Sequence, residues 1–149
     1  MQTILGSGGA IGNELAKALR EYTDQVRLVS RNPRKVYDDD ILHPANLLNA
    51  NETEKAVDGS EIAYLTVGLP YKAEVWQTAW PTIMHNVIQA CRIHGTRLVF
   101  FDNVYMYDKN HLNPMTEETP VNPPAKREKC GPRSPGCLWM KWRMGIYRL

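Results

Sequence analysis

A glycine-rich run near the N-terminus is the feature that most constrains how this chain folds. Residues 6–12 read Gly-Ser-Gly-Gly-Ala-Ile-Gly, follow the strand-like segment Gln2 to Leu5, and open an amphipathic helix. Such a turn lets the backbone approach a pyrophosphate closely, and the first helical amides and the positive end of the helix dipole then hold the anion. The expected cofactor-binding residues of the turn are Gly6, Ser7, Gly9, Ala10, Ile11 and Gly12.

The spacing of the glycines separates two classes of nucleotide-binding protein. Gly6, Gly9 and Gly12 form a GxxGxxG pattern, and no Lys followed by Ser or Thr completes a P-loop. A nucleoside triphosphatase is therefore not expected. The alternative is a glycine-rich turn without a ligand, in which four glycines in seven residues would cost backbone entropy for no return.

Strand-like and helix-like segments alternate along the first 100 residues. Apolar runs predict strands at residues 2–5, 25–30, 39–42, 62–67 and 97–102, and the run 62–67 is typical of a parallel strand covered on both faces. Helical spacing predicts helices at residues 11–22, 51–57 and 73–94. The pattern indicates an α/β fold with a doubly wound parallel sheet, Rossmann-like, with five strands in order 3-2-1-4-5.

Two apolar stripes indicate how the helices pack. In the first helix, the residues expected to face the sheet are Ile11, Leu15, Ala18, Leu19 and Tyr22. In the long helix, they are Trp80, Ile83, Met84, Val87, Ile88 and Cys91, so Cys91 is expected to be buried. Pro81 should kink this helix or begin its second half.

Length and composition limit the other possibilities. The 149 residues, 43% of them apolar, suffice for one core and leave no room for a second substrate domain. No apolar run approaches a membrane span and no secretory signal precedes the first strand, so a cytoplasmic protein is expected. Three cysteines and four scattered histidines indicate neither a disulfide framework nor a metal site.

The charge changes sign near residue 125. Residues 1–125 hold 11 Lys and Arg against 15 Asp and Glu, whereas residues 126–149 hold 7 Lys and Arg against Glu128 alone. We therefore expect a nucleotide-binding domain over 1–125 and an irregular basic tail over 126–149. The alternative interpretation of the tail is a basic, aromatic patch for nucleic acid or membrane, but its residues show no recurrent spacing.

The tail is also consistent with a shifted reading frame. Reading one nucleotide earlier, the codons of Trp139-Met140-Lys141 give Asp and then Glu, and residues 130–136 can become Val-Arg-Ala-Lys-Ile-Ala-Gly. The hypothesis is that a single-base slip near Lys129 truncated a longer protein and removed its sixth strand. The apolar surface left exposed would then favour self-association, including homo-oligomers.

Residues that follow the predicted strands are candidates for contact with the rest of a dinucleotide. Arg31 follows the second strand, where an NAD site typically has an acidic residue for the ribose, and its guanidinium suits a 2′-phosphate. This favours NADP over NAD, with Arg34 and Lys35 adding positive charge nearby; a solvated surface arginine is the alternative. The other candidates follow the third and fourth strands, and they are Asn46, Leu47, Thr66, Val67 and Gly68.

Taken together, residues 2–125 resemble the short-chain dehydrogenase/reductase superfamily, in its extended or atypical NAD-dependent epimerase/dehydratase branch. The resemblance is carried by the glycine pattern and by the segments 30–33 (Ser-Arg-Asn-Pro), 100–107 (Phe-Phe-Asp-Asn-Val-Tyr-Met-Tyr) and 117–123 (Glu-Glu-Thr-Pro-Val-Asn-Pro). It implies an NAD(P)-binding oxidoreductase that acts by hydride transfer on a carbonyl or sugar-nucleotide substrate.

The resemblance also implies catalytic positions that this chain fills unusually. The family's Ser or Thr after the fifth strand falls on Asn103 when Tyr107 is aligned, and Tyr105 and Tyr107 are the remaining catalytic candidates. The family's Tyr and Lys pair falls on Lys129 and Arg133, so its tyrosine is missing. The string from Tyr105 to Lys109 has the YxxxK spacing, but it leaves a strand and enters a loop, where no helix enforces that geometry.

Three functions follow from these patterns. The first is an NADP-dependent enzyme of the epimerase/dehydratase type, and the second is a non-catalytic NADP-binding module that alters a partner surface. The third is a half-domain that needs a partner chain. In the first two, the expected ligands are a dinucleotide and, for the enzyme, an unidentified small molecule, whereas neither nucleic acid nor a membrane is expected as a partner.

Overall fold

The computed structural model describes residues 1–70, 72–102, 107–111, 113–116, 118–120 and 122. It divides into two compact units, of which the first comprises Met1–Leu69 with Thr82–Phe101. The second comprises Pro70–Pro81 with Asp102–Leu149, and only its described residues are considered below. The domain boundary expected at residue 125 and the basic tail lie outside the described residues.

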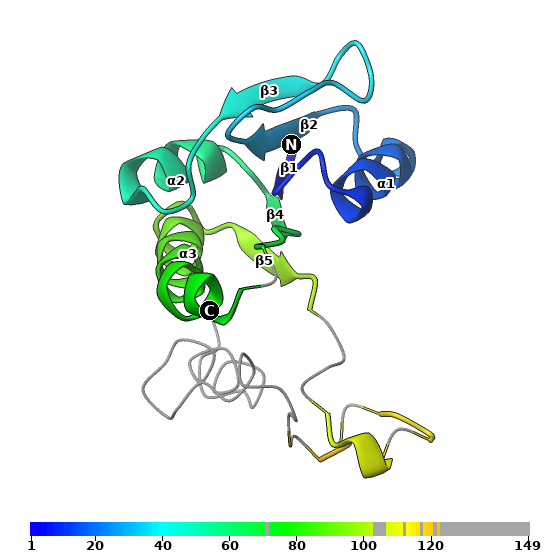
Figure 1. The fold of residues 1–149 in the computed structure, drawn as a ribbon. Helices are drawn as coiled ribbons and strands as arrows, with labels where there is room; N and C mark the ends of the chain where they lie inside the picture. The colour runs from blue at the N-terminus through cyan, green and yellow to red at the C-terminus, as the bar shows by residue number, and fades with distance from the viewer. Residues whose placement is uncertain (71, 103–106, 112, 117, 121, 123–149) are drawn as a thin grey trace. The chain divides into compact units, whose positions relative to one another are not determined.

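A single five-stranded sheet forms the centre of the first unit, in the order β3-β2-β1-β4-β5 (Figure 1). All four neighbouring pairs are parallel. The predicted fold class and strand order are therefore confirmed. The strands are β1 (Gln2–Leu5), β2 (Val26–Ser30), β3 (Ile41–Pro44), β4 (Ile62–Leu65) and β5 (Arg97–Phe100).

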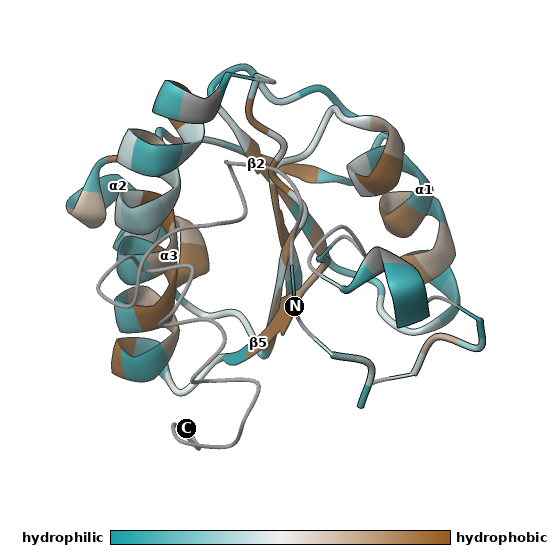
Figure 2. Cartoon of the chain, turned by 60° about the horizontal axis from the view of Figure 1, so that its bottom comes forward, coloured by the Kyte–Doolittle hydropathy of each residue, from teal (hydrophilic) through white to brown (hydrophobic). Residues whose placement is uncertain are grey.

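Helices cover both faces of the sheet. Helix α1 (Ala10–Ala18) lies on one face. Helix α2 (Ala50–Val57) and the part of α3 (Ala73–His94) that belongs to this unit, from Thr82 on, lie on the other, with the apolar strands between them (Figure 2). The largest fully buried side chains of β1, β2 and β4 are Ile4, Leu5, Val26, Leu28, Val29 and Leu65. Burial of this apolar surface between the two helical layers drives the sheet to fold.

The buried side of α1 differs from the predicted stripe. Ile11 is 43% exposed and Tyr22 is 75% exposed, and Ala18 is also exposed. Leu15 and, in the 3-10 turn η1 (Leu19–Glu21), Leu19 pack inward as predicted, together with Gly12 and Ala16, which the stripe did not include. The reason is the close approach of Gly12 to the preceding loop, which turns that side of the helix toward the sheet and displaces Ile11 outward.

Strand β3 begins two residues later than predicted. The side chain of Asp40 is buried, and its Oδ2 accepts hydrogen bonds from the backbone N–H groups of Val36 and Tyr37, both at 2.8 Å. Residues 36–40 are therefore held in a turn, so the strand starts only at Ile41. The predicted ends of β4 and β5 were also too long, because Thr66 and Phe101 lie beyond the last strand residues.

The predicted helices are present, with small differences at their ends. Asn49 caps α2, because its side chain accepts hydrogen bonds from the N–H groups of Asn51 and Glu52. Pro81 lies inside α3, which runs without interruption from Ala73 to His94. Cys91 is 1% exposed, as predicted, and burial raises the pKa of its thiol to about 12.

Two features are absent from the described part of the chain. No helix there has both the length and the hydropathy needed to cross a membrane. The same residues contain no group of three or more His, Cys, Asp or Glu side chains arranged to hold a metal ion.

The second unit has its own local contacts. Trp76 donates a 3.0 Å hydrogen bond from Nε1 to the Pro70 carbonyl, and its ring centroid lies 5.2 Å from that of Trp80. Farther along the chain, the N–H of Asp108 donates to the Pro120 carbonyl at 2.7 Å. The 3-10 turn η3 (Lys109–His111) lies in this segment.

Candidate functional site

The glycine-rich loop leaves the carboxyl end of β1 and lies against the chain that follows β4. Gly6 has φ of +106°, and a Cβ at this position would lie 2.6 Å from the backbone N and Cα of Val67. Only glycine satisfies both conditions, because a side chain would be strained and would also collide with backbone. The structure thus brings together the glycine loop and the segment Thr66–Val67, as the sequence predicted for a site at the carboxyl ends of the strands.

A second close contact fixes the start of α1. A Cβ on Gly12 would lie 3.0 Å from the Gly6 carbonyl oxygen and 3.4 Å from Oγ1 of Thr66. That hydroxyl lies 3.4 Å from the carbonyl oxygens of both Leu5 and Gly6 and donates toward them. Gly12 and Thr66 therefore determine the conformation of the loop. The Thr66 hydroxyl donates its hydrogen bond to backbone carbonyls of the protein.

Only part of the loop presents free N–H groups. The N–H groups of Gly6 and Ser7 both donate to the Val29 carbonyl of β2, at 2.9 and 3.0 Å. The first helical hydrogen bond runs from Asn13 N to the Gly9 carbonyl at 3.0 Å. Between these, the N–H groups of residues 8–12 have no backbone partner in the described part of the chain. The N–H groups left for a ligand are therefore those of residues 8–12, whereas those of Gly6 and Ser7 are used within the fold.

Residues 8–11 of this loop are exposed. Gly9 is the N-cap of α1, in extended conformation and without a side-chain cap. A Cβ on Gly8 would meet nothing within 4 Å, and one on Gly9 would meet only the Gly6 carbonyl oxygen at 3.9 Å. Ser7 Oγ is buried and has no hydrogen-bond partner among the described residues. Open space, unpaired N–H groups and a helix N-terminus together suit a diphosphate.

Arg31 begins the connection that follows β2, and its side chain is exposed. It makes no hydrogen bond or ion pair with other described residues, as is also true of Arg34. Lys35 instead uses its Nζ to donate to the Asp38 carbonyl. Of the three basic residues predicted here, two arginines are thus available to a ligand.

Side chains from two helices donate hydrogen bonds to the segment that follows β3. Asn46 is exposed, whereas Leu47 is buried. The Leu47 carbonyl accepts a 2.9 Å hydrogen bond from Nδ2 of Asn86, on α3, and a 3.3 Å bond from Oγ1 of Thr53, on α2. Sequence reasoning missed both of these residues. The signal available for Asn86 was an amide side chain between apolar residues of the predicted long helix. An amide that becomes buried requires a hydrogen-bond partner.

Of the three catalytic candidates, Tyr107 is among the described residues. Asn103 and Tyr105 lie outside the described residues. Tyr107 is buried, 8% exposed, and belongs to the second unit. Gly68, predicted to contact the cofactor, is exposed just beyond β4.

This architecture is that of a nucleotide-binding α/β protein of the Rossmann type, with a glycine-rich loop between β1 and α1. Residues 3–131 match the NAD dependent epimerase/dehydratase family. The chain therefore belongs to the NAD-dependent epimerase/dehydratase family, and a nicotinamide dinucleotide is the cofactor class of that family. No curated protein matches the chain.

Solved structures resemble the chain at low sequence identity. Uronate dehydrogenase from Agrobacterium tumefaciens superposes with a TM-score of 0.73 at 18% identity, over 85% of this chain and 49% of that protein. Glucuronic acid dehydrogenase from Chromohalobacter salexigens gives 0.71 at 17% identity, over 82% of this chain and 48% of that protein. A wide-type short-chain dehydrogenase/reductase from Veillonella parvula, in complex with NADP, gives 0.54 at 20% identity, over 70% and 48%. The chain thus spans about half the length of these neighbours.

Proposed function

We propose that this chain is the dinucleotide-binding part of an NAD(P)-dependent oxidoreductase of the epimerase/dehydratase type. The observation that carries the proposal is the set of N–H groups in residues 8–12 without a backbone partner in the described part of the chain, in a largely exposed loop at the start of α1. In this proposal the diphosphate binds to these N–H groups, and the adenosine extends toward the residues that follow β2 and β3. The bound nicotinamide supplies hydride transfer.

The structural neighbours support the cofactor class. A point mutant of the Agrobacterium uronate dehydrogenase was solved in complex with NAD, and the Veillonella protein was solved in complex with NADP. For this chain we propose a preference for NADP, because Arg31 is exposed and unpaired where an acidic side chain would favour NAD. The substrate in this proposal is a carbonyl compound or a sugar nucleotide.

A second candidate function is a non-catalytic NADP-binding module. It is favoured by Asn103, which stands where the family resemblance implies Ser or Thr, and by Lys129 and Arg133, which stand where it implies Tyr and Lys. Both functions require the same cofactor site. They differ in whether cofactor turnover accompanies binding.

The test is titration of the full chain with NADPH and, separately, NADH by isothermal calorimetry. The proposal expects saturable binding of one mole per mole of chain, with NADPH tighter. Turnover of NADPH in the presence of carbonyl or sugar-nucleotide substrates supports the enzyme, whereas binding without turnover supports the module. Binding of neither cofactor overturns the proposal.

A variant at Gly9 makes the test specific to the loop. Gly9→Ser places a good N-cap residue in a conformation that any residue adopts, so α1 should be kept or slightly stabilised. Its hydroxyl would accept from the N–H groups of Ile11 or Gly12 and would occupy the open space. We expect affinity for both dinucleotides to fall by about tenfold or more, the value of one or two lost charge-assisted hydrogen bonds, with an unchanged or raised melting temperature.

A further inference from the structure

The connection between β2 and β3 contains three basic and three acidic residues and no helix. It spans residues 31–40, whose basic members are Arg31, Arg34 and Lys35 and whose acidic members are Asp38, Asp39 and Asp40. Side-chain contacts therefore contribute to its conformation beside the backbone bond from Asp40 N to the Tyr37 carbonyl. The distribution of its charges depends on which of them pair within the fold.

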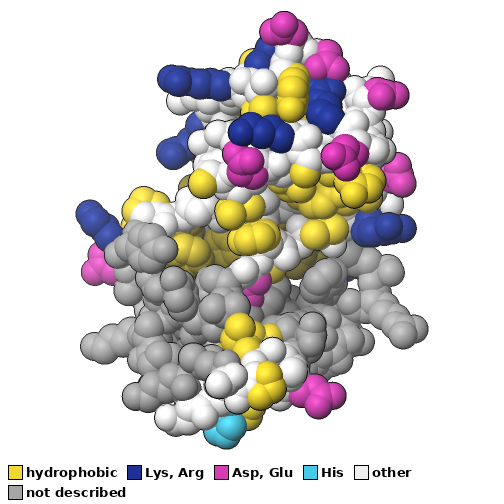
Figure 3. All heavy atoms as spheres, turned by 90° about the vertical axis from the view of Figure 1, so that its right-hand side faces the viewer, with side chains coloured by type: hydrophobic (Ala, Val, Ile, Leu, Met, Phe, Trp, Pro, Cys, Tyr) yellow, Lys and Arg dark blue, Asp and Glu magenta, His cyan; other side chains and the backbone are white. Residues whose placement is uncertain are grey.

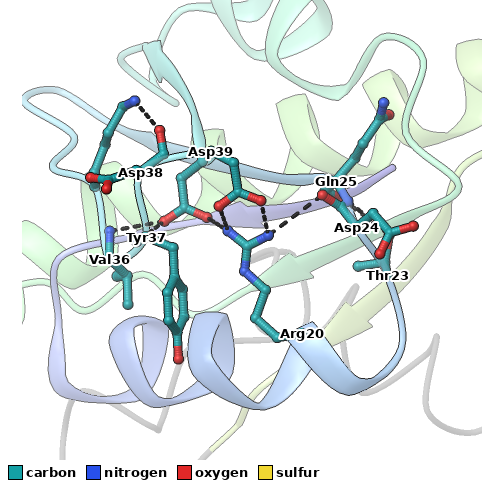
Figure 4. A network of polar contacts seen from close by, with 10 residues as sticks. Arg20, Thr23, Asp24, Gln25, Val36, Tyr37, Asp38 and Asp39 are labelled. Carbon is teal, nitrogen blue, oxygen red and sulfur yellow. Dashed lines mark hydrogen bonds and ion pairs between the residues drawn. The ribbon is translucent and has the colours of Figure 1, made fainter.

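Arg20, from η1, pairs with two of the three aspartates (Figure 4). Its Nη1 donates to Asp39 Oδ2 at 2.7 Å and its Nη2 donates to Asp39 Oδ1 at 2.6 Å, which is a bidentate pair. The same Nη2 donates to Asp40 Oδ1 at 2.6 Å. The guanidinium also lies over the ring of Tyr37, 4.8 Å from its centroid.

These contacts attach the connection to Arg20, a residue that lies outside it. The Asp40 side chain is fully buried, and its second oxygen holds the N–H groups of Val36 and Tyr37. The Arg20 side chain is only 20% exposed, so its charge acts in a partly desolvated setting. Loss of Arg20 would leave a buried carboxylate without its counter-ion.

The pairing also separates the charges of the connection. Basic and acidic side chains stand close together at the top of the face shown in Figure 3. Arg20 neutralises Asp39 and Asp40, while Lys35 is engaged by the Asp38 carbonyl. Arg31 and Arg34 are left exposed and without partners in the described structure.

We propose that Arg20 is a positioning residue for selectivity toward a 2′-phosphorylated dinucleotide. It acts by neutralising Asp39, the exposed one of the two carboxylates, so that this negative charge does not oppose a ligand phosphate at Arg31 and Arg34. The inference rests on the proposed function, since it concerns the same dinucleotide. Arg20 does not touch the cofactor in this account.

The test compares the ratio of NADPH to NADH dissociation constants, measured by calorimetry on the full chain. Arg20→Gln frees Asp39, and we expect NADPH binding to weaken by about fivefold relative to NADH, which is the value of a partly exposed ion pair. Adding Asp39→Asn to that variant should restore the ratio. NADH serves as the internal reference, because it carries every group of the ligand except the 2′-phosphate.

A second variant keeps the test decisive if Arg20→Gln does not fold. Asp39→Asn alone changes a side chain that is 65% exposed and leaves the Arg20 to Asp40 pair in place. Without the Asp39 charge, the positive charge of Arg20 is opposed by Asp40 alone, so the ratio should shift toward NADPH by up to about fivefold. The matched control is Glu61→Gln, which makes the same charge change at an exposed residue before the amino end of β4 and should leave the ratio unchanged.

The outcomes separate this inference from the proposed function. A wild-type chain that binds neither dinucleotide overturns both. A wild-type preference for NADPH, combined with Arg20 and Asp39 variants that weaken both cofactors equally or alter neither, overturns the inference alone. In that case Arg20 only stabilises the fold.

Discussion

The Nδ2 atom of Asn86 donates a 2.9 Å hydrogen bond to the Leu47 carbonyl, across 39 positions of sequence. The bond is buried, and it ties α3 to the segment that follows β3. In the proposed site that segment lies beside the adenine. Asn86, on a helix that sequence reasoning did not connect with the site, thus supports one side of the proposed cofactor site.

Truncation of this side chain should therefore destabilise the protein. Asn86→Ala leaves the Leu47 carbonyl with only the longer bond from Thr53, and we expect a loss of about 1–3 kcal/mol in the free energy of unfolding. Chemical denaturation measures it. The matched control is Gln89→Ala on the same helix, at a position that is less buried, which should change stability by less than about 0.5 kcal/mol. Equal effects of the two substitutions would show that the buried bond contributes nothing.

Gly6 should tolerate no side chain. Gly6→Ala combines a positive φ with a Cβ that would lie 2.6 Å from the Val67 backbone, so we expect about 3 kcal/mol or more of destabilisation. Thermal melting of the variant measures this loss. Gly68→Ala is the control, because a Cβ there meets nothing within 4 Å and should be nearly neutral. A stable Gly6→Ala variant would mean that the loop does not lie against Val67 as described.

Arg31 should decide which dinucleotide binds. Arg31→Asp removes the donor for a 2′-phosphate and restores the acidic residue typical of an NAD site, so the preference should reverse, with NADPH weakened by about 10- to 100-fold. Fluorescence titration with both cofactors measures the change. Arg97→Asp makes the same charge change at the exposed first residue of β5 and should preserve the preference. An unchanged preference in Arg31→Asp would remove Arg31 from the site.

Stability should fall with acidification in a way that depends on His43. Burial, and then the charges of Arg27 and Lys55, lower the pKa of His43 from its ordinary 6.5. The unfolded chain therefore takes up this proton more readily than the folded one, so stability is lost as pH falls below about 7 toward the folded pKa. Denaturation curves at pH 8 and pH 5 should show a smaller decrease for His43→Gln than for the wild type. Equal decreases would refute this role.

Much of the fold was predictable because it depends on local periodicity. The alternation of apolar runs with helical patterns predicted the strand order, and the burial of Cys91 followed from its place on an apolar helix stripe. The face of α1 was not predictable in the same way. Ile11 and Ala16 are both apolar, and the lack of room for a side chain between Gly12 and the Gly6 carbonyl, which favours the Gly12 side as the inward one, is visible only in the structure.

The candidate site was predictable in its location but not in its donors. The glycine spacing located the loop. Which of its N–H groups stay free depends on Val29 of the neighbouring strand, whose carbonyl accepts hydrogen bonds from Gly6 and Ser7. The Arg20 pair with Asp39 and Asp40 was also hidden, because nothing in the sequence pairs a helical arginine with an aspartate 19 or 20 positions later.

The sequence by itself determined the α/β class, the strand order and the position of the glycine loop, since these follow from hydrophobic periodicity and from glycine spacing along the chain. The tertiary structure decided which N–H groups remain free, which side of α1 is buried and which arginines are left unpaired. These properties depend on partners brought together from distant parts of the chain, and local residue patterns do not encode such partners.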